Sequence, residues 1–145
     1  MSLSNVFGIA GSAMNAQTIR LNTTASNMAN ADSVSSSLDE TYRARKPVFA
    51  VQQADPLAQP DNEAGIAAGQ GVQVLGIVES QAELRQEYNP AHPMADEEGF
   101  VYFPNVNVVE EMADMISASR SFQINTEIMN TAKQMLQQTI RLGQQ

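Results

Sequence analysis

The two ends of the chain carry repeating hydrophobic patterns that predict long helices. At the N-terminal end, mostly apolar positions recur with alternating spacings of four and three, the heptad spacing of helices that pack against one another. The opposite side of this helix carries Asn15, Arg20, Asn22 and Asn27. The pattern predicts a helix within residues 1–31 that buries one stripe, formed by Leu3, Phe7, Ala10, Met14, Gln17, Leu21, Thr24 and Met28.

The composition of this N-terminal helix indicates a weak helix built for close contact. Gly8 and Gly11 each cost an isolated helix about 1 kcal/mol relative to alanine. Gly8 and Ser12 form a pair of small residues one turn apart, which would let another backbone come close. Serine and asparagine are abundant on the helix, and we interpret them as groups that fix helix register by hydrogen bonds rather than by charge.

The C-terminal end predicts a longer helix, from Val108 to Leu142, of roughly 50 Å. Asn107 stands three residues before Glu110, which is the signature of a helix N-cap. At 100° per residue the apolar residues of this helix share one broad arc, and polar residues fill the rest. The arc consists of Ile116, Phe122, Ile124, Ile128, Met129, Ala132, Met135, Leu136, Ile140 and Leu142.

The middle of the chain is rich in proline, glycine and acidic residues and predicts short strands. We expect strands over Tyr42–Val51, Gly71–Val78 and Gly99–Phe103, with Val72, Val74 and Val78 on one face of the second. A flexible loop is expected near residues 52–70. The fold class is therefore α+β: long terminal helices packed as a coiled coil, with a small, irregular β-rich middle region. Its expected parts are residues 1–31, 32–104 and 105–145.

The width of the C-terminal apolar arc predicts assembly with other chains. The N-terminal helix has a narrow apolar stripe of small residues and can cover only part of that arc, and exposed apolar stripes mark interaction sites. The terminal segments are also poor in charge, as interface cores are. We therefore predict that subunits pack through Leu3, Phe7, Met14, Leu21, Met28, Met112, Met115, Ile116, Phe122, Ile124, Ile128, Met129, Met135, Leu136, Ile140 and Leu142.

Charge and composition exclude several other classes of protein. A net charge of −8 argues against a nucleic-acid partner, and we interpret the basic group Arg43, Arg45 and Lys46 as a solvated or subunit-contacting strand edge. No apolar segment is long enough to insert into a membrane, and the first residues lack the features of a secretory signal. The chain has no cysteine, and hence no disulfide framework or thiolate zinc site.

The sequence offers no convincing catalytic, cofactor or metal site. His92, the single histidine, stands in a proline-rich turn without the orienting partner that a catalytic histidine needs. Asp96, Glu97 and Glu98 are consecutive, unlike the spaced ligands of a calcium loop, and predict a solvated turn. We therefore expect no enzyme activity, no cofactor and no small-molecule substrate.

Several segments resemble the family of flagellar axial proteins, and in particular its proximal-rod members. The resemblance covers nearly the whole chain except residues 52–69. After Asn30 many rod and hook relatives carry Asn-Thr-Pro-Gly-like residues, whereas this chain continues Ala31-Asp32, as proximal-rod proteins do. The segments are Ser12–Gln17, Ala25–Asp32, Tyr42–Phe49, Asn89–Tyr102, Pro104–Met112, Met115–Arg120 and Asn130–Met135.

The resemblance implies a structural subunit of the rod that crosses the periplasm and transmits motor torque to the hook and filament. It implies export through the flagellar type III gate without a cleaved signal peptide. The partners it implies are copies of the chain, other rod subunits and the export-gate adapter FliE. Two alternatives stay open: another short rod subunit or adapter, and a secreted coiled-coil binding module.

Overall fold

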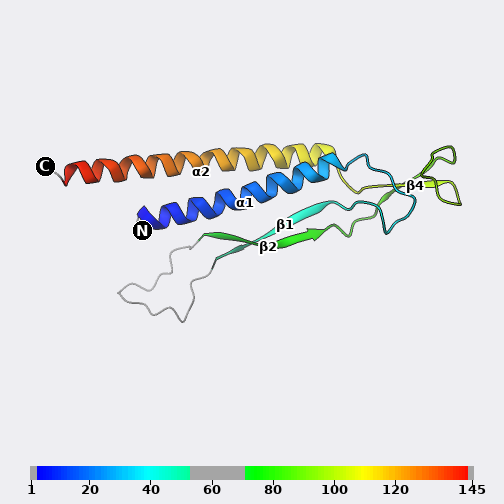
Figure 1. Ribbon diagram of the computed structural model, residues 1–145, viewed down its shortest axis with the longest axis horizontal. Coiled ribbons are helices and arrows are strands. Elements are labelled where there is room, and N and C mark those ends of the chain that lie inside the picture. Colours follow the sequence, from blue (N-terminus) through cyan, green and yellow to red (C-terminus); the bar gives the residue numbers. More distant parts are fainter. Residues whose placement is uncertain (1–2, 53–70, 144–145) are drawn as a thin grey trace, which may run out of the picture.

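A computed structural model describes residues 3–52 and 71–143 as an elongated molecule with a long helix at each end of the chain (Figure 1). The predicted loop near residues 52–70 falls almost wholly outside the described residues. Two antiparallel hairpins lie between the helices in sequence, so the α+β class is confirmed. The elements are α1 (Leu3–Ala29), β1 (Arg45–Val51), β2 (Val72–Glu79), β3 (Arg85–Tyr88), β4 (Phe100–Phe103) and α2 (Val108–Leu142).

The helices α1 and α2 pack side by side, as the paired terminal patterns predict, and the structure shows that they run antiparallel. Arg20 of α1 forms an ion pair with Asp114 near the start of α2, 2.7 Å between Nη2 and Oδ1. Further toward the other end of the molecule, the Thr126 hydroxyl donates to the Met14 sulfur at 3.5 Å. The helix α2 is the longer of the two and continues past the N-terminal end of α1 (Figure 1).

The predicted N-cap of α2 is confirmed. Asn107 has an extended backbone, and its side-chain oxygen accepts a hydrogen bond from the Val109 amide at 3.1 Å. Glu110 and Glu111 then stand in the first turn, where the helix dipole favours negative charge. The Glu110 carboxylate accepts a hydrogen bond from Lys46 of β1, so it also ties the helix to the first hairpin.

The helix α1 lies between α2 and the β1–β2 hairpin, which makes three layers (Figure 1). The side of α1 that faces the hairpin carries small residues one turn apart, and β2 begins close against it. The Ser12 hydroxyl accepts from the Val72 amide at 3.1 Å. Gly71 has a φ of +112°, and a side chain there would collide with Ser12. This second stripe consists of Ser12, Ala16, Ile19, Thr23 and Ser26.

The prediction that Val72, Val74 and Val78 share a strand face is wrong, and a bulge explains it. Val74 pairs with Phe49 and Gly76 pairs with Val48, so Leu75 is an extra residue in β2. One extra residue shifts the in–out alternation of a strand. Val72 and Val74 are consequently half-buried, whereas Val78 is 52% exposed.

The second hairpin forms the tip of the molecule opposite the chain termini (Figure 1). Its strand β3 was not predicted, because its residues are all exposed and show no hydrophobic alternation. The strand β4 supplies Val101, which is 1% exposed and the largest apolar side chain fully buried among the described residues. Ser35 pairs with Tyr102 through two backbone hydrogen bonds of 3.1 Å, which anchors the segment after α1 to this tip.

Candidate assembly surface

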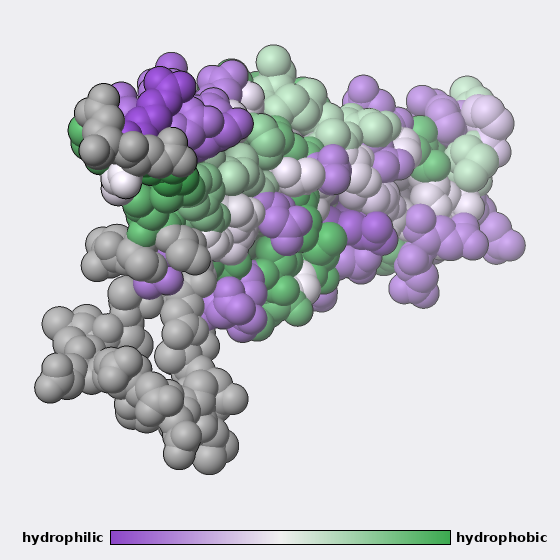
Figure 2. Space-filling model, turned by 60° about the vertical axis from the view of Figure 1, so that its left-hand side comes forward, coloured by the Kyte–Doolittle hydropathy of each residue, from purple (hydrophilic) through white to green (hydrophobic). Residues whose placement is uncertain are grey.

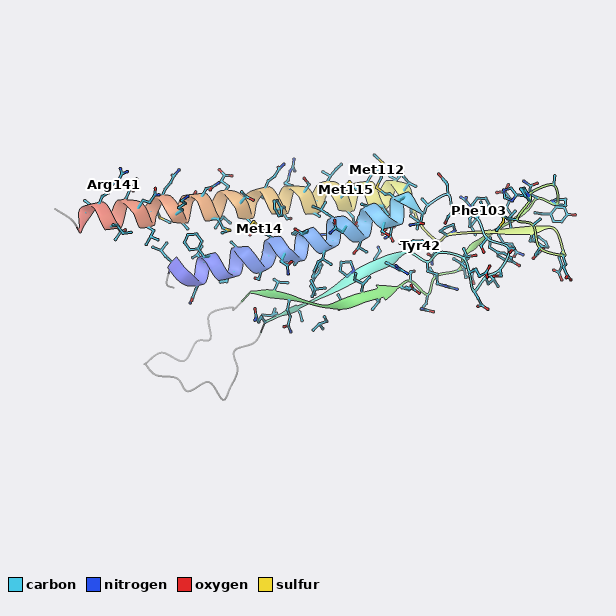
Figure 3. All side chains as sticks on the ribbon, viewed as in Figure 1. Met14, Tyr42, Phe103, Met112, Met115 and Arg141 are labelled. Atoms are coloured by element: carbon cyan, nitrogen blue, oxygen red, sulfur yellow. The ribbon has the colours of Figure 1, made fainter. Side chains whose placement is uncertain are left out.

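The seam between α1 and α2 is closed by small side chains. Ala10 of α1 and Ala118 and Ala132 of α2 are almost fully buried, so the helix backbones can come close together. Larger residues flank these positions and are half-buried, and Figure 3 shows Met14 between the two helices. The predicted packing residues found in or beside the seam are Leu3, Phe7, Met14, Leu21, Met28, Met115 and Met129.

The other predicted packing residues all belong to α2 and remain exposed in the single chain. Because alanines form the seam, contact with α1 buries only a small part of the apolar arc. Burial of apolar surface is the main favourable contribution to the free energy of association. Contact with another molecule that covers the remaining apolar surface of α2 is therefore favourable. These residues are Met112, Ile116, Phe122, Ile124, Ile128, Met135, Leu136, Ile140 and Leu142.

A first group of exposed residues, the outer group, lies on the side of α2 that faces away from α1. Its members are Val109, Met112 and Ile116, which are 76%, 50% and 64% exposed. At 100° per residue they fall opposite the buried Ala118 and Ala132. Figure 3 shows Met112 projecting from the outer edge of α2. Because α1 lies on the opposite side, the outer group needs a different molecule to cover it.

A second group, the flank group, lies on one side of α2 and consists of Ile124, Ile128 and Met135. Together with Val6 of α1 and Ala132 of α2 it lines a shallow, mostly apolar groove of about 290 Å³. Apolar surface gathers toward the end of the molecule that carries both termini (Figure 2). The groove is thus a second apolar contact area, which faces in a different direction from the outer group.

A third group, the overhang group, consists of Leu136 and Ile140, which are 41% and 53% exposed. At 100° per residue both fall close to the direction of the seam residues Ala118 and Met129. The helix α2 continues past the described N-terminal end of α1, and Arg141, next to Ile140, lies in this projecting part (Figures 1 and 3). The overhang group therefore continues the line of the seam without a partner helix from the described part of the chain.

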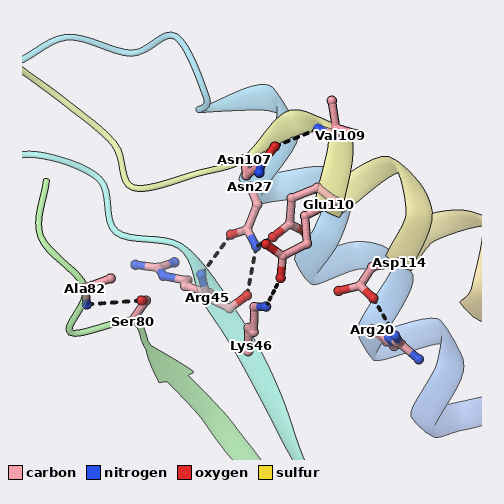
Figure 4. Close-up of polar contacts among 11 residues, drawn as sticks. Arg20, Asn27, Arg45, Lys46, Ser80, Ala82, Asn107, Val109, Glu110 and Asp114 are labelled. Atoms are coloured by element: carbon pink, nitrogen blue, oxygen red, sulfur yellow. Dashed lines mark hydrogen bonds and ion pairs between the residues drawn. The ribbon is translucent and has the colours of Figure 1, made fainter. Parts of the chain in front are cut away.

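Polar contacts hold the other end of the helix pair to the first hairpin (Figure 4). Besides Arg20–Asp114, Lys46 of β1 pairs with Glu110 of α2 at 2.9 Å. The Glu110 hydrogen bond raises the pKa of Lys46, burial opposes this, and the charges of Glu110, Asp114 and Glu111 reinforce it. Both side chains of the Lys46 pair are more than half exposed, so it stabilises the fold only weakly.

The basic group is a largely solvated strand edge, as predicted, because Arg45 and Lys46 are exposed at the start of β1; its contact with another subunit stays a prediction. Each of its members has a partner within the chain. Arg43 donates to the carbonyls of Ser80 and Ala82, Arg45 pairs with Glu79, and Lys46 pairs with Glu110. The sequence pattern showed a positive cluster but could not show the acidic residues that the fold brings to it.

The acidic turn at the tip is only partly the solvated turn that the sequence predicts. Glu97 and Glu98 are exposed, but Asp96 is half-buried and organises the loop. Its Oδ1 accepts from the amides of Phe100 at 2.8 Å and Glu98 at 3.0 Å, and its Oδ2 accepts from the Tyr102 hydroxyl. The pKa of Asp96 is lowered, mainly by the Phe100 amide. His92 is a turn residue, as predicted, and its Nδ1 accepts from the Met94 amide.

Comparison with known proteins identifies the class. Residues 7–35, which span most of α1, match the family described as "Flagella basal body rod protein". Residues 97–142, which span β4 and α2, match "Flagellar basal body rod FlgEFG protein C-terminal". No helix among the described residues is long and apolar enough to cross a membrane. The two terminal helices therefore correspond to the parts that flagellar rod proteins share.

Relatives over the whole chain define the family more closely. The flagellar basal-body rod proteins FlgC of Escherichia coli O6:H1 and of Salmonella typhimurium are 49% identical over 144 residues, covering 99% of this chain and 100% of theirs. FlgC of Borreliella burgdorferi is 35% identical over 153 residues, with 99% of each chain covered. The chain belongs to the FlgC family of flagellar basal-body rod proteins. It is a structural subunit of the flagellar basal-body rod.

Proposed function

We propose that the chain self-assembles with copies of itself and with other rod subunits into the proximal rod, the shaft that transmits motor torque to the hook. In this proposal the chain reaches its site through the flagellar export gate and meets the adapter FliE at the base of the rod. Its position is the periplasm-crossing part of the basal body. Membership of the FlgC family supports assembly into the flagellar basal-body rod. The exposed apolar residues of α2 support the mechanism.

The observation that carries the mechanism is that the apolar residues of α2 point in three directions. The outer group faces away from α1, the flank group lines the groove beside Val6, and the overhang group follows the seam beyond α1. A single additional helix cannot cover all three. We infer that each α2 contacts at least two neighbouring subunits, and that the terminal helices pack there as coiled coils.

Such an arrangement explains how a rod of small subunits resists shear. Burial of apolar surface is worth roughly 25 cal/mol per Å² and is spread over many side chains, so no single bond carries the torque. Alanine in the α1–α2 seam brings two helices together as one unit, and the larger residues then connect that unit to its neighbours. The low charge of the helical end favours these contacts, because charged residues are depleted at interface cores.

The test is to place a charge in the flank group. Ile128→Asp and Met135→Asp introduce a carboxylate into an apolar contact, at a cost of several kcal/mol if the contact is fully buried. Cells that carry either variant are expected to export the protein but to lack complete rods and to be non-motile. Gln134→Asp, an exposed polar position on the same helix, is the control and should support swimming. Normal swimming with both flank variants would refute the assembly role of this groove.

A further inference from the structure

The side-chain amide of Asn27 lies where four segments of the chain meet, and it is 1% exposed (Figure 4). The segments are α1, which carries Asn27 itself, the loop at Tyr42, the first residue of β1, Arg45, and the first turn of α2 at Glu111. The heptad pattern had assigned Asn27 to the polar outer side of α1. That assignment is wrong, because β1 and the start of α2 cover this end of the helix.

Every hydrogen-bonding position of this amide is used. The Nδ2 group donates to the Arg45 carbonyl at 2.8 Å and to Glu111 Oε1 at 3.0 Å. The Oδ1 atom accepts from the Tyr42 hydroxyl and from the Arg45 amide, both at 2.9 Å. A primary amide has two N–H donors and one oxygen with two lone pairs, so the four contacts fill its capacity.

The Asn27 amide pairs with the backbone of Arg45 on both sides, as a neighbouring β-strand would. It therefore fixes the start of β1 against α1. Its remaining donor holds the Glu111 carboxylate, which is 4% exposed, and so fixes the start of α2 as well. Aspartate lacks the two donors, leucine, of similar shape, lacks all four groups, and glutamine carries the same amide but one methylene further from the backbone.

Other contacts between α1 and the first hairpin do not select one geometry to the same degree. Ala16 and Thr23 are small and permit sliding, and the Ser12–Val72 hydrogen bond fixes only the start of β2. The ion pairs that join α1 and β1 to α2, Arg20–Asp114 and Lys46–Glu110, are partly or largely exposed. A fully satisfied buried polar network, in contrast, is stable in one arrangement only, because any shift leaves a buried group unpaired.

The geometry points to Asn27 as a positioning residue: it is the joint that sets the orientation of the β1–β2 hairpin relative to the α1–α2 pair. The hairpin exposes Val51, Leu75 and Val78, and α2 exposes its three apolar groups, on different layers of the molecule. A fixed joint presents both layers to neighbours in one relative orientation. The joint itself is independent of the proposed function, and only its consequence for rod assembly rests on that function.

The orientation can be measured in the purified full-length chain, which has no native cysteine to interfere with labelling. Spin labels attached through Val51→Cys on β1 and Gln123→Cys on α2, both exposed, report the distance between the layers. We expect a narrow distance distribution in the parent chain. Asn27→Asp should broaden it, because the donors to Arg45 and Glu111 are lost and two carboxylates then face each other.

A rescue variant separates positioning from general stability. Glu111→Gln combined with Asn27→Asp restores a donor between the two side chains and should narrow the distribution again in part. Asn15→Asp, an exposed asparagine on the same helix, is the matched control and should change nothing. A role in stability alone would lower the melting temperature of Asn27→Asp but leave the distances of the folded molecules unchanged, and that result would overturn the inference.

If Asn27→Asp does not fold, a milder variant tests whether Asn27 sets the orientation of the hairpin. Tyr42→Phe removes one of the four hydrogen bonds and should broaden the distribution slightly while the chain stays folded. An unchanged distribution in Tyr42→Phe would then overturn the inference. In cells, Asn27→Asp should abolish swimming. If Asn27→Asp broadens the distance distribution but the cells swim normally, the inference that Asn27 sets the orientation of the hairpin stands. Only the importance of this orientation for rod assembly is then refuted.

Discussion

At the β3–β4 tip and at Asn27, a single side chain holds separate backbone segments together through several hydrogen bonds. Asp96 collects two backbone amides and a tyrosine hydroxyl, and thereby shapes the loop between β3 and β4. Gly99 completes this loop with a φ of +86°, and an added Cβ would lie 2.9 Å from the Tyr88 ring. Such residues carry no hydrophobic signal, so periodicity in a sequence cannot identify them. Their partners are set by the fold.

The loop around Asp96 is expected to loosen at acid pH. Hydrogen bonds, chiefly from the Phe100 amide, lower the pKa of Asp96 below its ordinary value of 3.8, although burial opposes them. Because the folded-state pKa lies below that of the unfolded chain, the ionised carboxylate stabilises the loop above pH 3.8. This contribution is lost as the pH falls through the lowered pKa.

The measurement is the chemical shift of the Phe100 amide proton, followed by NMR from about pH 6 to pH 2. The parent chain should show a titration step with a midpoint below the ordinary aspartate value. Asp96→Asn should remove that step, whereas the exposed neighbour Glu97→Gln should retain it. The same titration curve in the parent chain and in Asp96→Asn would contradict the assigned role.

At the scale of elements, the sequence predicts the helices well and the strands only in part. The bounds of α2 and its cap at Asn107 follow from local signals: amphipathic period, capping residue and first-turn acids. The second face of α1 was recognised only at Ser12, in the small pair that admits another backbone, because Ala16 and Thr23 give no hydrophobic signal of their own. The strand β3 and the bulge at Leu75 depend on pairing partners distant in sequence.

The candidate assembly surface was predicted as one set of residues, and the structure divides it. Periodicity in α2 correctly finds the apolar residues but cannot tell which direction α1 will occupy. That direction is set by the alanines at 118 and 132, which are inconspicuous in a hydrophobicity pattern because they are small. The seam therefore falls at one edge of the arc, and most of the large residues remain exposed.

The glycines of α1 give a prediction at this scale. Gly8 and Gly11 lie in a helix and have open space where a side chain would stand, so alanine at both positions removes a helix penalty without a clash. The double variant should raise the free energy of unfolding by about 1–2 kcal/mol, measured by urea denaturation of the purified chain. Gly71→Ala is the opposing control, because its positive φ and its contact with Ser12 should make it destabilising. Destabilisation by the Gly8/Gly11 variant would contradict this account of α1.

The whole molecule has two ends of different character. The helical end carries exposed apolar residues and few charges, whereas the tip carries Asp96, Glu97, Glu98, Glu83 and Glu87 among its residues. Between these ends, Asn27 and the ion pairs of α2 hold α1, β1 and α2 together. In the proposed rod, the helical end makes the tight apolar contacts. The acidic tip remains hydrated, and the joint at Asn27 keeps the β1–β2 hairpin in a fixed orientation relative to the helix pair.

The overhang of α2 allows the fold of the subunit to be separated from assembly. Leu136 and Ile140 are exposed in the single chain, so Leu136→Asp and Ile140→Asp should leave the melting temperature of the purified chain nearly unchanged. Met129, half-buried at the seam, provides the comparison: Met129→Asp should lower the melting temperature, since a charge at that contact costs up to several kcal/mol. All three variants should prevent swimming, but only Met129→Asp through the fold of the subunit itself.

Export must be scored separately from motility, because a chain that is not secreted cannot assemble whatever its surface. Gln137→Asp, an exposed polar position in the same turn of α2, is the control and should be exported and support swimming. If Leu136→Asp and Ile140→Asp are exported and then fail to build rods, neighbouring subunits cover the overhang, as the unpaired seam of α2 requires. If cells with either variant swim normally, the overhang is a free helix end, and the contacts between subunits must be made by the outer and flank groups alone.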